Sequence, residues 1–139
     1  AAARGADLAL NARDTDVVAE IKEATHGHGV DVAFDVAGAL ETPQQAVDVV
    51  KPGGKVVITG INAEDQIPLH ATEARRKGVT VRLVRRMKHV YPRAIALATL
   101  ARIDLTGLVS HTFALDQAAE AFRAVDECPE GLIKVVVEV

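Results

Sequence analysis

The sequence is poor in the residues that build several common kinds of site. It contains a single cysteine, which excludes both an internal disulfide and a zinc site made of several cysteines. Aromatic residues make up only 3% of the chain, which disfavours a surface that stacks nucleic acid bases. The formal net charge of −3 gives no reason to expect nucleic acid or a membrane as partner. No apolar run approaches the roughly 18 residues that a membrane-spanning helix needs.

The glycine fingerprint of dinucleotide-binding folds is also missing. In that fingerprint, Gly-x-Gly-x-x-Gly follows a strand and opens a helix, so that the pyrophosphate meets the helix N-terminus. Here Gly27 and Gly29 precede an apolar stretch, and Val32 stands where the third glycine would be. We therefore predict that Gly27 ends a helix and that Gly29 belongs to a turn.

Strand and helix signals alternate along the first hundred residues, with short connections. This alternation predicts an α/β fold with a parallel sheet and helices on both of its faces. Residues 30–36 are largely apolar, as in a strand buried on both faces. We expect strands over 6–10, 30–36, 55–60, 79–84, 108–113 and 132–139, and helices that begin near Asp14 or Thr15, Thr42, Leu69, Pro92 and Asp116.

Helix caps and apolar faces support these helices. Thr42 is predicted to cap its helix, with Pro43 at the first helical position and Gln45 completing a capping box. The helix that opens at Pro92 is expected to be long and to carry Ile103 on its apolar face.

Three strand ends are the places where a ligand is expected, because open α/β sheets bind ligands beyond the carboxyl ends of their strands. Small residues at two of them would let a flat ligand approach the backbone, and arginines at the third could meet phosphate or carboxylate. The ordinary alternatives are turns and a solvated edge. The three segments are Val36-Ala37-Gly38, Thr59-Gly60-Ile61 and Val84-Arg85-Arg86.

Other polar residues give weaker signals. His26 and His28 have the spacing of metal ligands but no suitable Cys, Asp or Glu nearby, which favours a solvated turn. Cys128 has no identifiable base and is interpreted as inert. Asp35, at the end of a strand, could bind a ribose hydroxyl or cap the next turn.

Four runs occur in this order along the chain: residues 30–38, 50–61, 86–95 and 108–115. Together they resemble the C-terminal part of the medium-chain, zinc-binding alcohol dehydrogenases, and the Tyr-Pro-Arg-Ala-Ile piece is most similar to the sorbitol (L-iditol) dehydrogenase branch. The resemblance covers essentially the whole chain.

The resemblance implies two partial domains. Residues 1–104 would be the C-terminal part of a Rossmann-type, doubly wound parallel sheet whose first βαβ unit is missing. Residues 105–139 would be a short return segment of the GroES-like catalytic domain. Eight residues would contact NAD or NADP: Thr59, Gly60 and Ile61 on the nicotinamide side, Ala37 and Gly38 near the adenosine half, and Arg85, Arg86 and Met87 after the last coenzyme-domain strand.

The implied activity is hydride transfer between a secondary alcohol or polyol and NAD(P). In the parent enzyme, zinc would polarise the substrate, and the zinc ligands, the glycine fingerprint and the proton relay would precede residue 1. We therefore expect no catalytic or metal-binding residue in this chain, and we expect the chain alone to be inactive. Two alternatives stay open, namely a zinc-free relative such as a quinone reductase, and a non-catalytic α/β binding or vestigial module.

The expected setting is cytoplasmic, with a small-molecule alcohol or polyol as substrate. An exposed sheet edge would favour paired or swapped assemblies, so we also expect a homo-oligomer.

Overall fold

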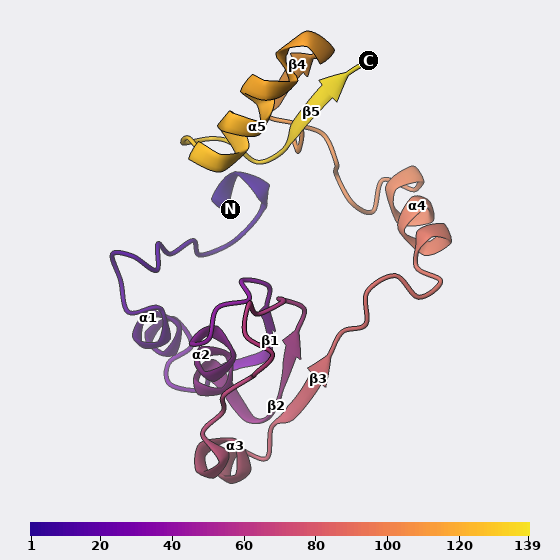
Figure 1. Ribbon diagram of the computed structural model, residues 1–139. Helices are drawn as coiled ribbons and strands as arrows, with labels where there is room; N and C mark the ends of the chain where they lie inside the picture. The colour runs from indigo at the N-terminus through magenta and orange to yellow at the C-terminus, as the bar shows by residue number, and fades with distance from the viewer. The chain divides into compact units, whose positions relative to one another are not determined.

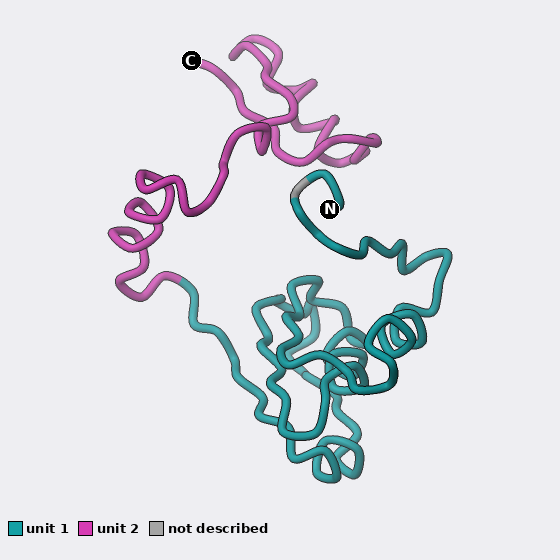
Figure 2. Tube along the Cα trace, turned by 180° about the vertical axis from the view of Figure 1, so that it is seen from behind, with its two compact units in different colours: residues 1–86 teal, residues 87–139 magenta. Residues whose placement is uncertain are grey.

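The chain forms two compact units, residues 1–86 and 87–139 (Figure 2). The computed structural model describes all residues in full except Arg4, of which only its place in a short helix is described. The domain division expected between residues 104 and 105 is a matter of family architecture, and it stays a prediction.

The first unit is an α/β unit, as predicted (Figure 1). Its three strands are parallel and lie in the order β1-β2-β3. The connections between successive strands contain helices α2 and α3, which is the alternation that the sequence indicated. Its elements are η1 (Ala2–Arg4), α1 (Val17–Ala24), β1 (Val30–Asp35), α2 (Thr42–Val49), β2 (Val50–Ile58), α3 (Ala71–Lys77) and β3 (Thr80–Leu83).

The core of this unit lies between β2 and helix α2. Helix α2 packs on β1 and β2, helix α3 packs on β2, and the two helices touch each other, so both cover the same face of the sheet. The prediction of helices on both faces is therefore not met by these two helices. Gly78 ends α3 in the left-handed conformation, as a helix-stop glycine does. The buried cluster consists of Ala46, Val47, Val50, Val56 and Ile58.

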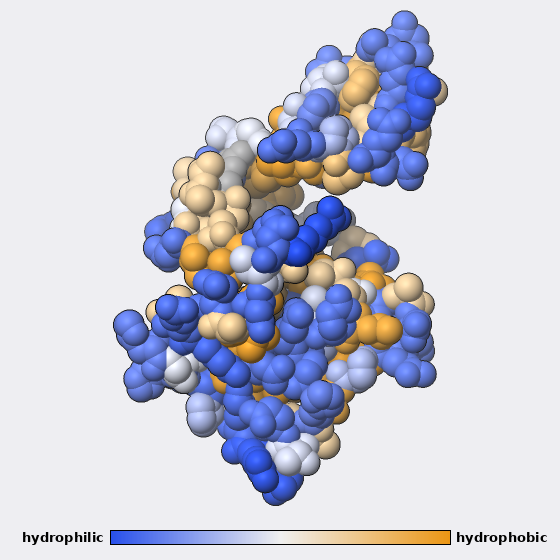
Figure 3. All heavy atoms as spheres, turned by 90° about the vertical axis from the view of Figure 1, so that its left-hand side faces the viewer, coloured by the Kyte–Doolittle hydropathy of each residue, from blue (hydrophilic) through white to orange (hydrophobic). Residues whose placement is uncertain are grey.

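The expectation that residues 30–36 are buried on both faces is wrong. Strand β1 stands at the edge of the sheet, and Phe34 keeps 66% of its surface exposed. The side chains that face away from α2, Val32 and Phe34 on β1, are left at the surface. An apolar run predicts a strand but does not by itself say how many elements will cover it. On the face drawn in Figure 3, hydrophobic atoms, in orange, lie among the polar surface atoms, in blue.

Residues 6–10 do not form the predicted strand. A strand exists only through hydrogen bonds to a neighbour, and this segment joins neither described sheet.

Two predicted helix caps are also wrong. Helix α1 is capped by Asp16, whose Oδ1 accepts hydrogen bonds from the amides of Val18 and Ala19, rather than by Asp14 or Thr15. Helix α2 has Glu41 at its N-cap without a side-chain hydrogen bond, because the Thr42 hydroxyl is turned toward Asp35 instead.

The second unit contains a two-stranded parallel sheet and helix α5. Helix α4 is shorter than predicted and ends at Thr99, so Ile103 lies outside it. Asp116 does not cap α5, because a 3₁₀ turn carries the chain past it and Gln117 takes the N-cap position. The elements are α4 (Tyr91–Thr99), β4 (His111–Ala114), η2 (Leu115–Gln117), α5 (Ala118–Glu127) and β5 (Val135–Glu138). Among all the helices described, none combines the length and the hydrophobicity required to cross a bilayer.

Candidate functional site at the carboxyl edge of the sheet

The three candidate segments leave the sheet of the first unit at the same edge. Asp35 pairs with Ile58, and Ile58 pairs with Leu83, so the three parallel strands end at one level. The amide of Val84 still donates to the Ile58 carbonyl at 2.9 Å, which extends the pairing by one residue. We call the segments that follow, residues 36–38, 59–61 and 84–86, the carboxyl edge.

Two glycines let the first two segments of the carboxyl edge touch through their backbones. A Cβ atom on Gly60 would lie 2.4 Å from the Gly38 nitrogen and 2.8 Å from its Cα. A Cβ atom on Gly38 would lie 2.5 Å from the Ile61 carbonyl oxygen, and Gly38 also has a positive φ of 70°. No other residue fits either position without moving backbone, so the predicted small residues have a steric reason.

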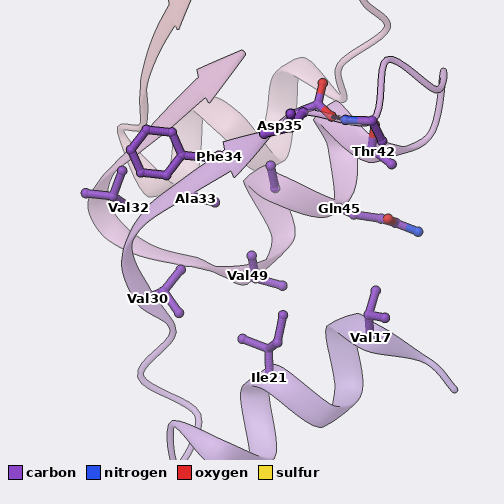
Figure 4. Close-up of a pocket in the computed structure, with 13 residues that line it drawn as sticks. Val17, Ile21, Val30, Val32, Ala33, Phe34, Asp35, Thr42, Gln45 and Val49 are labelled. Carbon is purple, nitrogen blue, oxygen red and sulfur yellow. Dashed lines mark hydrogen bonds between the residues drawn. The ribbon is translucent and has the colours of Figure 1, made fainter. Parts of the chain in front are cut away.

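Asp35 joins these segments by hydrogen bonds. Its carbonyl oxygen accepts from the amides of Thr59 and Gly60, at 2.8 and 3.0 Å, and from the Thr59 hydroxyl at 2.7 Å. Its carboxylate Oδ1 accepts from the Ala37 amide at 3.2 Å and from the Thr42 hydroxyl at 2.8 Å (Figure 4). Of the two roles open to Asp35 on sequence grounds, the contact with Ala37 is the one that caps the following turn.

The basic part of the carboxyl edge is exposed. Arg85 and Arg86 follow β3 and end the first unit, with their side chains in solvent. Met87 begins the second unit with a positive φ of 56°, and its sulfur accepts a hydrogen bond from the Tyr91 hydroxyl at 3.3 Å. Ile61 keeps 78% of its surface exposed, which leaves an apolar side chain open to a ligand.

A groove of about 500 Å³ runs along the free side of β1, between α1 and α2 (Figure 4). Apolar side chains line most of it: Val17 and Ile21 from α1, Val30 and Ala33 from β1, and Val49 from α2. Asp35, next to the carboxyl edge, also lines this groove.

The residues described do not fit a zinc site. Nowhere in the described part of the chain do three or more His, Cys, Asp or Glu side chains gather in a way that could hold a metal ion. Cys128 is exposed and has a positive φ of 44° at the end of α5, and it belongs to no such group among the described residues.

A known protein family matches most of this chain. The model of the zinc-binding dehydrogenase family matches residues 1–100. The chain is 30% identical over 133 residues to sorbitol dehydrogenase of Bacillus subtilis, which aligns 96% of this chain with 38% of that protein. It is 33% identical over 137 residues to an alcohol dehydrogenase of Cupriavidus necator, with 96% of this chain and 37% of the relative aligned.

The fold is shared with solved structures of the same kind. The alcohol dehydrogenase TADH from Thermus sp. ATN1 superposes with a TM-score of 0.87 at 27% identity, covering 99% of this chain and 39% of that one. The chain therefore spans a little more than a third of the length of the relatives it matches.

Proposed function

Because this chain belongs to the zinc-binding dehydrogenase family, we propose that it forms the C-terminal part of an NAD(P)-dependent, zinc-type alcohol or polyol dehydrogenase. The observation that carries the proposal is the carboxyl edge, where three parallel strands end together. Ligands of open α/β sheets bind at such an edge. Two of the relatives are named sorbitol dehydrogenase and alcohol dehydrogenase, and these names support this substrate class.

The cofactor would lie across the carboxyl edge. Ala37 and Gly38 would contact its adenosine half, and Thr59, Gly60 and Ile61 its nicotinamide side. At Gly38 and Gly60 only backbone groups could contact the cofactor, because glycine has no side chain, and the Gly60 amide already donates to the Asp35 carbonyl oxygen. Ile61 would exclude water beside the ring.

Arg85 and Arg86 would contact the negatively charged phosphates of the cofactor. Arg85 and Arg86 are exposed, and their guanidinium groups suit the phosphates of NAD or the extra phosphate of NADP. Met87, the next residue, would contribute an apolar contact. When bound, the nicotinamide would accept a hydride from the carbinol carbon of the substrate.

We infer that the chain alone does not catalyse this reaction. Its described residues hold no zinc site, and its sequence holds no Gly-x-Gly-x-x-Gly loop for the pyrophosphate. Residues 1–104 would belong to the coenzyme domain and residues 105–139 to the catalytic domain. The whole enzyme would act on a small-molecule alcohol or polyol in the cytoplasm, as a homo-oligomer.

An NMR titration tests the cofactor part of this proposal directly. NADH, and separately NADPH, is added to the ¹⁵N-labelled chain, and the amide shifts are followed residue by residue. We expect weak binding, because the pyrophosphate loop is missing, with the largest shifts at 37–38, 59–61 and 85–87. Shifts confined to other residues, or no shifts at all, would contradict the proposal and favour a non-catalytic module.

A further inference from the structure

Asp35 is the buried charged residue of the described chain, with 4% of its surface exposed. A carboxylate removed from water destabilises the fold unless hydrogen bonds compensate, so its presence needs a reason. The compensation is incomplete, because among the described residues Oδ2 is buried without a hydrogen-bond partner. Stability alone is therefore a poor explanation for a carboxylate at this position.

Beyond the pairing of β1 with β2, the hydrogen bonds described for Asp35 end on residues of the carboxyl edge or on the first turn of α2. Oδ1 fixes the Ala37 amide and the Thr42 hydroxyl, and the carbonyl oxygen fixes the Thr59 and Gly60 amides. One residue thus connects the end of β1, the start of α2 and the end of β2.

The contact between Gly38 and Gly60 makes this connection geometrically demanding. Their backbones are so close that neither can move toward the other without displacing it. The Asp35 carboxylate holds Ala37, beside Gly38, whereas Thr59 and Gly60 are held by the main-chain carbonyl of residue 35. The carboxylate therefore acts on the second turn through the contact between Gly38 and Gly60. The turn after β1 and the turn after β2 are therefore positioned as a pair.

We propose that Asp35 is a positioning residue for the cofactor, which holds the Ala37–Gly38 and Thr59–Ile61 backbones in the arrangement that receives it. Asp35 does not touch the cofactor in this account. The inference rests on the proposed function, because it is the cofactor that needs the two turns fixed. A pre-positioned site does not have to be ordered at the moment of binding, and affinity falls when its supports are removed.

The test compares three variants of this chain. Asp35→Ala removes the side-chain acceptor, whereas Asp35→Asn keeps a carbonyl oxygen at the Oδ1 position and removes the charge. Val47→Ala is the control. Val47 is fully buried in the core on α2 and is not a residue of the carboxyl edge, so this substitution destabilises the unit without removing a group from the candidate site. For each variant, NADH affinity is measured by NMR titration at a temperature where unfolding curves show the protein folded.

We expect Asp35→Ala to weaken NADH binding by about tenfold, Asp35→Asn to stay closer to the wild type, and Val47→Ala to bind normally. The Ala37 amide loses its acceptor Oδ1 in Asp35→Ala and should exchange faster in that variant alone, whereas the Thr59 and Gly60 amides keep their acceptor, the backbone carbonyl of residue 35. Unchanged affinity in Asp35→Ala, or an equal loss in Val47→Ala, would overturn the positioning role.

The exchange measurement separates this inference from the proposed function. If the wild-type chain binds no NADH, the proposed function fails for this chain, and amide exchange then decides the role of Asp35. Unchanged exchange at Ala37 in Asp35→Ala would overturn the positioning role in that case, and acceleration at Ala37 that is absent from Val47→Ala would support it.

Discussion

The ammonium group of Lys77 closes the C-terminal end of helix α2. Its three N–H donors have carbonyl partners at Val47, Asp48 and Val50, at 3.0, 2.8 and 3.1 Å. These carbonyls are the ones that a helix leaves unsatisfied at its end, where a positive charge is also favourable. Nothing in the sequence marked Lys77 for this role, because the two helices that it joins are about 30 residues apart in the chain.

Replacing Lys77 with Met should therefore lower the free energy of unfolding by about 2 kcal/mol, through the loss of charged hydrogen bonds to partly buried carbonyls. Arg76→Met, on the same helix but exposed, serves as control and should change stability by less than about 0.5 kcal/mol. Urea unfolding of both variants gives the comparison. Equal stabilities would show that Lys77 does not cap α2.

Asp31 should titrate abnormally. The hydrogen bond from Lys51 and its positive charge hold the pKa of this carboxyl below its ordinary value of 3.8. Because the folded-state pKa is lowered, the pair stabilises the fold above the unfolded-state pKa, and this contribution disappears as the pH falls through the folded-state value. Both side chains are largely exposed, so salt should weaken the effect.

The pKa of Asp31, followed by NMR, should rise toward 3.8 in Lys51→Met and stay low in Lys55→Met, which removes a nearby exposed charge. A pKa that does not respond to Lys51→Met would mean that the ion pair is not formed in solution.

At the scale of elements, helix α1 depends on its cap because it has few neighbours. Asp16→Ala removes the acceptor for the Val18 and Ala19 amides and should cost about 1 kcal/mol. Asp14→Ala is the matched control. Asp14 instead accepts a hydrogen bond from the Asn11 side chain, so its removal should cost less. Chemical denaturation gives the free energy of unfolding of both variants. A larger loss in Asp14→Ala than in Asp16→Ala would mean that Asp14 is the cap.

The sequence predicts elements well where the signals are local. Gly78 marks the end of α3, and Pro43 marks the first turn of α2, because each acts on its own backbone. It predicts less well what depends on distant partners. Residues 6–10 have strand character but no neighbour in either described sheet, and Thr42 prefers Asp35, seven residues away, to its own helix.

The candidate site divides in the same way. That the three segments of the carboxyl edge would share one edge follows from the parallel order of the strands, and the sequence predicts it. The connection through Asp35 could not be chosen in advance, because a carboxylate at a strand end has several possible partners.

At the scale of the whole molecule, the free side of β1 should make the chain self-associate. Unpaired backbone groups and the exposed Val32 and Phe34 form a hydrophobic sheet edge, which favours pairing with another chain. Val32→Lys should lower the average mass measured by light scattering, whereas Thr72→Lys, on the exposed face of α3, should not. A wild-type chain that stays monomeric at high concentration would contradict this expectation.

An enzymatic assay of a chimera tests directly whether this chain is the C-terminal part of an alcohol or polyol dehydrogenase. The 38% of Bacillus subtilis sorbitol dehydrogenase that aligns with this chain is replaced by it, and NAD-dependent and NADP-dependent oxidation of sorbitol and other alcohols is assayed. If this chain supplies the C-terminal part of such an enzyme, the chimera should turn over at least one alcohol, and the 139-residue chain alone should turn over none. A chimera that folds and holds zinc but reduces neither cofactor would contradict the account.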